Sequence, residues 1–177
     1  PDVVLDRGVG ARLWDKAGRS YIDLYAGVAV SALGHGHPAL VRAISEQAAK
    51  LLHVANYFHT EANIRLAEKL CQMTHMDRAF FCNSGTEANE ALLKLVRRHF
   101  YNQGQPERLR VLAFENSFHG RTLGALAATG QPKYQEGFGP LPGVVHVPYG
   151  DIERVRAVYD SSFAAILVEP ILGEGGV

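Results

Sequence analysis

Apolar runs that alternate with helical patterns between residues 79 and 168 constrain the fold of this chain most strongly. Helical spacing, with apolar residues three and four apart, covers Thr86–Tyr101 and Ile152–Tyr159. Strands that are buried on both faces are almost continuously apolar, and such strands alternating with helices make parallel sheets. The chain is therefore predicted to have an α/β fold, with a mostly parallel sheet flanked by helices. The expected strands are Ala79–Cys82, Leu109–Phe114, Val144–Val147 and Phe163–Val168.

The N-terminal part has a different pattern. Short β-forming runs at residues 3–5, 11–14 and 21–24 are separated by turn residues, and Asp15–Gly18 has the composition of a hairpin turn. Helices are expected to begin at Pro38 and directly after Thr60. Composition changes near residues 53–60, so we expect a boundary between an N-terminal segment, 1–55, and an α/β domain, 56–177.

Charge and composition exclude several classes of function. Eighteen basic residues balance eighteen acidic ones, so no nucleic-acid or anionic-membrane surface is indicated. No apolar run is long enough to span a bilayer. Cys71 and Cys82 fit reduced thiols of a cytoplasmic protein better than a disulfide framework. His35 and His37 have no third ligand nearby, so no metal site is expected.

Functional groups are concentrated after three of the expected strands. These loops are Asn83–Thr86, Glu115–Thr122 and Glu169–Gly176. The carboxyl ends of parallel strands meet at one edge of a sheet, where α/β proteins bind ligands. The three loops are therefore expected to face one crevice.

Ser84-Gly85-Thr86 joins a strand to the start of a helix. Free backbone N–H groups at a helix N-terminus, together with two hydroxyl groups, suit a phosphate. The alternative is an ordinary Ser/Thr helix cap. Local pattern alone leaves both interpretations open.

The other two loops carry an aromatic ring, a guanidinium and a carboxylate. Phe118 offers a flat apolar surface for a planar ring, or is an ordinary packed aromatic residue. Arg121 suits a bidentate carboxylate, or is a surface cation. Glu174, among glycines, either pairs with a nearby cation beside a ligand or is a solvated turn residue. Phosphate, planar ring and carboxylate together are what pyridoxal phosphate chemistry requires.

The sequence of these loops resembles that of a known family. Asn83–Glu90, Ser117–Thr122 and the Glu-Pro-x-x-Gly-Glu-Gly-Gly run at 169–176 are similar to class III pyridoxal-phosphate-dependent aminotransferases, and most similar to the acetylornithine/ornithine aminotransferases. The Gly-His-Gly-His-Pro run at 34–38 and the region around residues 14–23 match as well, so the resemblance covers essentially the whole chain.

The resemblance implies the fold of type I pyridoxal-phosphate transferases. Residues 1–55 would be part of the small domain, and residues 56–177 the first part of the large cofactor-binding domain, truncated before its second half. It implies that the phosphate is held by Ser84, Gly85 and Thr86, and that Phe118 and His119 also contact the cofactor. The substrate-binding residues implied are Arg121 for the α-carboxylate, the movable Glu174, and Val28.

The resemblance also implies a reaction. The δ-amino group of N-acetylornithine would pass to 2-oxoglutarate, a step of arginine biosynthesis, in a cytoplasmic homodimer to which residues 53–60 contribute. Ornithine, succinylornithine and 4-aminobutyrate are alternative donors. A non-catalytic α/β protein that binds a phosphate ligand is the alternative from another class.

Two positions depart from the family pattern. Leu172 replaces the usual Gln, which removes a polar group expected near the cofactor or substrate. Val28 stands where ornithine-specific enzymes carry a Tyr, which favours an N-acylated substrate. The Schiff-base Lys and the Asp that faces the pyridine nitrogen are expected beyond Val177. We therefore expect a fragment that is inactive alone, since Lys16, Lys50, Lys69, Lys94 and Lys133 lack the apolar setting of a catalytic lysine.

Overall fold

The computed structural model describes residues 2–139, 141 and 143–176; positions 1, 140, 142 and 177 lie outside the described residues. The chain divides by its internal contacts into two units, residues 1–69 and residues 70–177. Each unit has a sheet of its own. The expected division between residues 55 and 56 concerns the small and large domains of the family, and it stays a prediction.

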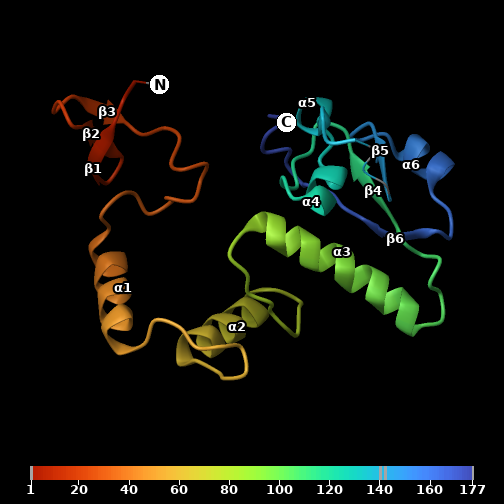
Figure 1. Cartoon of the computed structure of the whole chain (residues 1–177), viewed down its shortest axis with the longest axis horizontal. Helices are drawn as coiled ribbons and strands as arrows, with labels where there is room; N and C mark the ends of the chain where they lie inside the picture. Colours follow the sequence, from red (N-terminus) through yellow and green to blue (C-terminus); the bar gives the residue numbers. More distant parts are fainter. Residues whose placement is uncertain (1, 140, 142, 177) are drawn as a thin grey trace. The chain divides into compact units, whose positions relative to one another are not determined.

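The first unit begins with an antiparallel sheet of strands β1 (Leu5–Val9), β2 (Arg12–Asp15) and β3 (Ser20–Ile22), in that order (Figure 1). The predicted hairpin turn joins β2 to β3. Within it the Asp15 carboxylate accepts hydrogen bonds from the backbone N–H groups of Ala17, at 3.0 Å, and Arg19, at 2.9 Å. Gly18 takes a φ of +80°, which a residue without Cβ adopts readily. The turn chemistry read from the sequence is thus confirmed.

Two helices follow in sequence, α1 (Pro38–Lys50) and α2 (Glu61–Met73), and the division between the units lies within α2. Pro38 is the first residue of α1, where its missing N–H costs no hydrogen bond. The Thr60 hydroxyl accepts a hydrogen bond from the Asn63 N–H at 3.4 Å, just before α2. Both expected helix starts are therefore confirmed.

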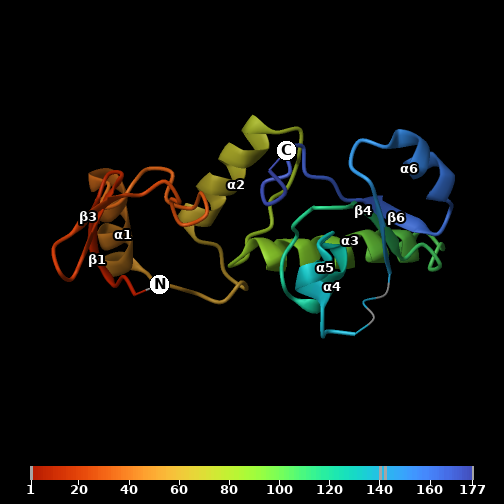
Figure 2. The same cartoon turned by 90° about the horizontal axis from the view of Figure 1, so that it is seen from above.

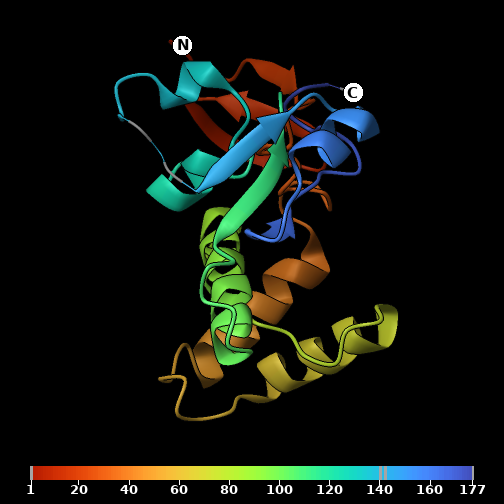
Figure 3. The same ribbon diagram turned by 90° about the vertical axis from the view of Figure 1, so that its right-hand side faces the viewer.

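The second unit is built on a parallel sheet. Its strands are β4 (Arg110–Phe114), β5 (Val144–Val147) and β6 (Phe163–Ile166), and the order β5-β4-β6 places β4 in the centre. Figure 3 shows β4 and β5 running side by side in the same direction. Three of the four expected strands are present, and the predicted parallel pairing is confirmed.

Helices cover both faces of this sheet. The faces differ because successive side chains of β4 alternate. On one face, Val155 of α6 (Ile152–Val158) joins Leu112, Val147 and Phe163 in the hydrophobic core. On the other face lie α3 (Gly85–Asn102) and α4 (Leu123–Ala128). Figure 2 shows α6 on the opposite side of the strands from α3 and α4.

The structure corrects three expectations about secondary structure. Ala79–Cys82 is not a strand: it pairs with no other strand of the described chain, and the side chain of Phe80 is 73% exposed. A run of β-forming residues becomes a strand only when a neighbour supplies the hydrogen bonds. Strand β6 ends at Ile166, before the expected Val168. The short helices α4 and α5 (Pro132–Gln135) were not expected, because each is too short to show helical periodicity.

No helix in the described parts of the chain is both long and apolar enough to cross a membrane. Among the same residues, no three His, Cys, Asp or Glu side chains gather closely enough to hold a metal ion.

Candidate active site

The start of α3 is capped by a reciprocal pair of hydrogen bonds. The Ser84 hydroxyl accepts from the Glu87 N–H at 3.3 Å, and the Glu87 carboxylate accepts from the Asn83 N–H at 2.8 Å and from the Ser84 hydroxyl at 3.1 Å. Hydrogen bonds from the side chains of Asn83 and Ser84 lower the pKa of Glu87. This resembles a capping box, except that Glu87 accepts the backbone N–H of Asn83, the residue before the cap, and not that of Ser84. The helix-cap interpretation of Ser84 is therefore confirmed.

The cap leaves the next two backbone donors open. Gly85 and Thr86 are the first two residues of α3, and the first N–H groups of a helix have no partner within it. No hydrogen bond in the described chain takes either N–H group. Gly85 is exposed, and an added Cβ there would meet open space. The anion-binding interpretation is thus compatible with the cap, since the two use different donors.

The loop 115–122 lies directly against this helix start. The Thr86 and Thr122 hydroxyl oxygens are 3.0 Å apart. Gly120 has a φ of +127°, and a Cβ added there would lie 2.6 Å from the Cβ of Thr86 and 2.9 Å from that of Ala125. Only glycine allows this approach. Two of the three predicted loops therefore meet.

His119 is held between α3 and the loop after α4. Its carbonyl accepts a hydrogen bond from the Asn89 side chain at 2.6 Å, and its N–H donates to the Thr129 hydroxyl at 2.9 Å. The imidazole is only 6% exposed, and its Nε2 has no hydrogen-bond partner among the described residues. Desolvation lowers the pKa of His119. A neutral imidazole with an unpartnered Nε2 therefore lies beside the helix start.

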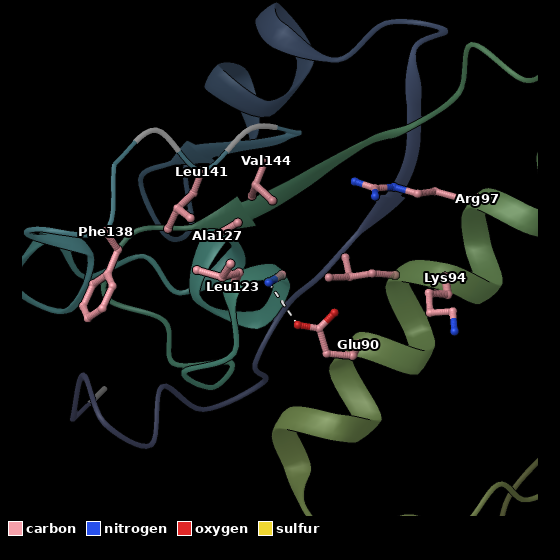
Figure 4. A pocket seen from close by; sticks show the side chains of 10 residues that line it. Glu90, Lys94, Arg97, Leu123, Ala127, Phe138, Leu141 and Val144 are labelled. Atoms are coloured by element: carbon pink, nitrogen blue, oxygen red, sulfur yellow. Dashed lines mark hydrogen bonds between the residues drawn. The ribbon is translucent and has the colours of Figure 1, made fainter.

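Glu90 reaches from α3 to the first turn of α4. Its Oε1 accepts hydrogen bonds from the Thr122 hydroxyl at 2.5 Å, the Gly124 N–H at 2.9 Å and the Ala125 N–H at 3.2 Å. Figure 4 shows this carboxylate directed toward α4. The hydrogen bond from Thr122 lowers the pKa of Glu90. Glu90 thus caps a second helix, which sequence spacing on α3 did not reveal.

A groove opens between α3 and α4 beside Glu90 (Figure 4). It is lined on the α3 side by Lys94 and Arg97, and on the other side by Leu123, Ala127 and Phe138. None of the predicted site residues is among its lining residues, so the groove is separate from the candidate site.

Glu169 joins the second and third loops. Its Oε1 accepts the Phe118 N–H at 2.6 Å, and its Oε2 accepts the Gly173 N–H at 3.0 Å. The third predicted loop therefore meets the second, and all three loops form one connected region.

Tyr134 contacts the aromatic and charged side chains of that region. Its ring meets Phe118 edge to face at 5.8 Å between centroids, and the Arg121 guanidinium carbon lies 4.7 Å from the Tyr134 centroid. Its hydroxyl donates to Glu174 Oε1 at 2.7 Å. Lys133, expected in a connection, places its ammonium nitrogen 4.6 Å from the centroid of the same ring. Phe118, Arg121 and Glu174 are thus brought together by a residue that sequence reasoning missed.

The two positions that depart from the family pattern have distinct surroundings. Leu172 is 2% exposed, and an added Cβ at Gly175 would lie 3.1 Å from its Cβ. It therefore packs beneath its own loop rather than facing a crevice. Val28 belongs to the first unit, is exposed, and takes a φ of +58°. With Ala26, Gly27 and Ala29, also at positive φ, it forms a left-handed turn that is unusual for a β-branched residue.

The residues that sequence reasoning missed carried weak signals. Tyr134 follows Pro-Lys in what read as a connection, and Asn89 and Glu90 read as polar positions of an amphipathic helix. Glu169 stood at the start of the third loop without an assigned role. In these hydrogen bonds their partners lie thirty or more residues away in sequence, so only the folded chain shows their use.

The comparison with protein families decides which family this site belongs to. The family model described as aminotransferase class-III matches residues 1–177. The chain belongs to the class-III aminotransferases. It is 57% identical over 178 residues to the acetylornithine aminotransferase of Myxococcus xanthus, covering 100% of this chain and 44% of that protein. It is 52% identical over 172 residues to acetylornithine aminotransferase 1 of Pseudomonas syringae pv. tomato, covering 97% of this chain and 42% of the relative.

The fold of this class-III chain is that of the family's solved structures. The ornithine aminotransferase of Toxoplasma gondii, whose structure is described as having partial occupancy of pyridoxal phosphate at its active site, matches with a TM-score of 0.92 and 34% identity. That match covers 100% of this chain and 43% of the Toxoplasma chain. The predicted type I transferase fold is confirmed. The chain spans less than half the length of these relatives.

Proposed function

We propose that the complete protein transfers the δ-amino group of N-acetylornithine to 2-oxoglutarate, with pyridoxal 5'-phosphate as cofactor, in arginine biosynthesis. The observation that carries this proposal is the contact between the start of α3, with its open Gly85 and Thr86 N–H groups, and the loop that bears Phe118 and Arg121. Both named acetylornithine aminotransferases match the chain over nearly its whole length.

The residues present fit the cofactor. Backbone N–H groups at the start of a long helix favour a phosphate through hydrogen bonds and the helix dipole. The absence of a side chain at Gly85 leaves space for it, and the unpaired Nε2 of His119 adds a polar group nearby. We assign Ser84, Gly85 and Thr86 to the phosphate, with Ser84 acting mainly by fixing the helix start.

Phe118 supplies the planar apolar contact in this proposal. Glu169 holds its backbone from one side and Tyr134 meets its ring from another, so the ring is fixed before a ligand binds. A preorganised aromatic face loses little freedom when a planar ring packs on it. His119, buried and neutral, is assigned to the same cofactor environment.

Arg121 binds the substrate carboxylate in this proposal. The guanidinium presents a planar fork of donors that matches a carboxylate, and in the described structure its N–H groups have no hydrogen-bond acceptor. We assign Glu174, on the neighbouring loop, to the selection between the two substrates of the reaction. Val28 is assigned to the substrate side chain, and its lack of a hydroxyl favours an acylated amino acid.

Pyridoxal phosphate, when bound, supplies the electron sink and carries the amino group between the two substrates. The residues of this chain bind and orient: they fix the phosphate, cover one face of the ring and place the carboxylate. The lysine and aspartate that act on the cofactor are assigned to a part of the protein outside these 177 residues, since the relatives are more than twice as long. A homodimer in the cytoplasm completes the proposal, with residues 53–60 reaching the partner's site.

A direct assay of the full-length protein tests the substrate. N-acetylornithine, N-succinylornithine, ornithine and 4-aminobutyrate are each supplied with 2-oxoglutarate, and glutamate formation is followed. We expect kcat/KM for N-acetylornithine to exceed that for ornithine by about tenfold or more, the scale of discrimination that pocket contacts give. A preference for another donor would reassign the substrate within the family. Cofactor binding without amino transfer from any donor would favour the non-catalytic alternative.

A further inference from the structure

Tyr134 contacts two oppositely charged residues that come from different loops. Its hydroxyl donates to the Glu174 carboxylate at 2.7 Å, while its ring lies 4.7 Å from the guanidinium carbon of Arg121. These residues are 13 and 40 positions away in sequence. Tyr134 is thus the physical link between the cation and the anion of the candidate site.

The helix that bears Tyr134 is anchored on both sides. The Gln135 side chain donates to the carbonyl groups of Thr129, at 2.8 Å, and Leu126, at 3.1 Å. The Gln131 side chain lies 3.3 Å from the Ser117 carbonyl. Helix α5 has only four residues and few backbone hydrogen bonds, and these side-chain bonds add to them. The ring of Tyr134 is therefore in a fixed position relative to the loop 115–122.

Arg121 and Glu174 do not form an ion pair with each other in the described structure, although both contact Tyr134, Arg121 at its ring and Glu174 at its hydroxyl. A direct pair would satisfy both charges and would occupy the donors of Arg121. Instead, Glu174 is satisfied by a neutral hydroxyl, and Arg121 lies against an aromatic ring, which attracts a cation without using its N–H groups. With Lys133 also near the ring, two cations and one anion surround Tyr134. The surplus positive charge favours an incoming carboxylate.

We propose that Tyr134 is a positioning residue that holds Glu174 away from Arg121, so that Arg121 stays open to the carboxylate of a substrate. This inference rests on the proposed function, which assigns Arg121 to that carboxylate. Removal of the hydroxyl frees Glu174 to compete for the guanidinium. An exposed ion pair weakens a competing ligand by up to about fivefold, so the expected effect is a three- to fivefold loss of carboxylate affinity.

The test uses the full-length protein loaded with cofactor and the variant Tyr134→Phe, which removes only the hydroxyl. The probe is glutarate, a dicarboxylate that has no amino or keto group to react. Its Kd is measured by titration calorimetry, and KM and kcat for N-acetylornithine are measured alongside. We expect Kd and KM to rise about three- to fivefold, with a smaller change in kcat. Tyr159→Phe is the matched control, since Tyr159 stacks on Phe163, away from this site.

A second background separates positioning from general damage. In Glu174→Gln protein the competing charge is absent, so adding Tyr134→Phe is expected to leave the glutarate Kd within about twofold of Glu174→Gln alone. An equal loss in both backgrounds, or an unchanged Kd in the single variant, would overturn the inference. Arg121→Ala identifies a different failure: if it leaves glutarate binding intact, the carboxylate site lies elsewhere, and both the inference and the assignment of Arg121 are overturned.

Discussion

The backbone N–H of Phe118 donates to the side chain of Glu169 at 2.6 Å, across fifty-one positions of sequence. The same carboxylate accepts the Gly173 N–H with its other oxygen. One side chain therefore fixes the loop that carries Phe118 and Arg121 to the loop that carries Glu174. A carboxylate is suited to this role because both of its oxygens accept.

Glu169→Gln should loosen this junction. An amide offers one acceptor oxygen, so either Phe118 or Gly173 would face an NH₂ group and lose its hydrogen bond. We expect the free energy of unfolding of the full-length protein to fall by about 1–3 kcal/mol, the cost of leaving a donor unsatisfied, and the affinity for pyridoxal phosphate to fall with it. Urea denaturation and fluorescence titration measure the two effects.

Glu136→Gln is the control for this substitution, because Glu136 is exposed and its side chain has no partner among the described residues. A Glu169→Gln protein as stable as that control would show that the junction contributes little.

Gly120→Ala should disrupt the contact between the loop and the helix start. The new Cβ would lie 2.6 Å from the Cβ of Thr86, and the backbone is already at a φ of +127°. Overpacking of this kind costs about 1–3 kcal/mol, and the strained backbone adds to it. We expect cofactor affinity to fall at least about tenfold, measured by the absorbance of bound pyridoxal phosphate during titration.

The matched variant is Gly104→Ala, also at positive φ, +73°, but with open space around the added Cβ. It should cost only about 1–2 kcal/mol of stability, from backbone conformation alone, and should leave cofactor binding unchanged. Equal losses in the two variants would mean that the close approach to Thr86 is unimportant.

Glu90→Gln should weaken the start of α4. A helix cap contributes about 0.5–2 kcal/mol, and here a charged cap faces the positive end of a helix. The pKa of Glu90 is lower in the folded state than in the unfolded state, chiefly because of the hydrogen bond from Thr122. Its contribution to the free energy of unfolding is therefore complete at pH values above the pKa of the unfolded state. That contribution is lost as the pH falls through the pKa of the folded state. The difference in Tm between wild type and variant should therefore be larger at pH 7 than at pH 3.5. Glu68→Gln, on the exposed surface of α2, serves as the reference.

His119 should make stability depend on pH in the range just below neutrality. Burial lowers its pKa below the unfolded value, so the folded state binds fewer protons and is destabilised as pH falls through about 6.5. In cofactor-free protein, His119→Gln should show a smaller loss of unfolding free energy between pH 7 and pH 5 than wild type. His75→Gln, at an exposed position, should retain the wild-type slope; a His119→Gln slope equal to wild type would contradict the prediction.

The 177-residue chain alone should catalyse no measurable amino transfer. Lys133 lies beside the assembled loops, but it is exposed and faces the Tyr134 ring rather than an apolar pocket. A catalytic lysine needs a setting that favours its neutral form. Glutamate formation by the chain is compared with that of the full-length protein under identical conditions. A normal turnover number for the chain would show that Lys133 or another lysine here suffices.

The sequence predicts this fold where its local signals and tertiary structure agree. The apolar runs at 109–114, 144–147 and 163–168 became the three strands of the parallel sheet, and Pro38, Thr60 and Asp151 mark the helix starts. It fails where a segment depends on distant partners. Ala79–Cys82 has the composition of a strand but no strand beside it in the described chain, and the short helix α4 is defined by burial and by Glu90 rather than by its own periodicity.

For the site, the sequence indicates which loops meet but not what holds them together. The loops 115–122 and 169–176 follow strands of the parallel sheet and converge because of topology. Residues 84–86 meet residue 120 although the run before them is not a strand, so the strand pattern predicted this meeting for a reason that the structure does not bear out. The bonds made by Glu90, Glu169 and Tyr134 are long-range and use ordinary polar residues, which have no periodic signature. Leu172 illustrates the same limit, since its burial beneath its own loop is invisible in a motif.

The span of Glu90 from α3 to α4 has a consequence for engineering. A Cβ at position 124 would lie 2.8 Å from Glu90 Oε1. Glu90 can therefore accept the backbone N–H groups of α4 only if residue 124 is a glycine. A chimaera that imports the 115–122 segment from another transaminase would inherit its aromatic and basic side chains without the Glu90 hydrogen bonds that orient them. Transplants should therefore carry residues 90, 120 and 124 as one set, and designers who vary substrate range should leave that trio untouched.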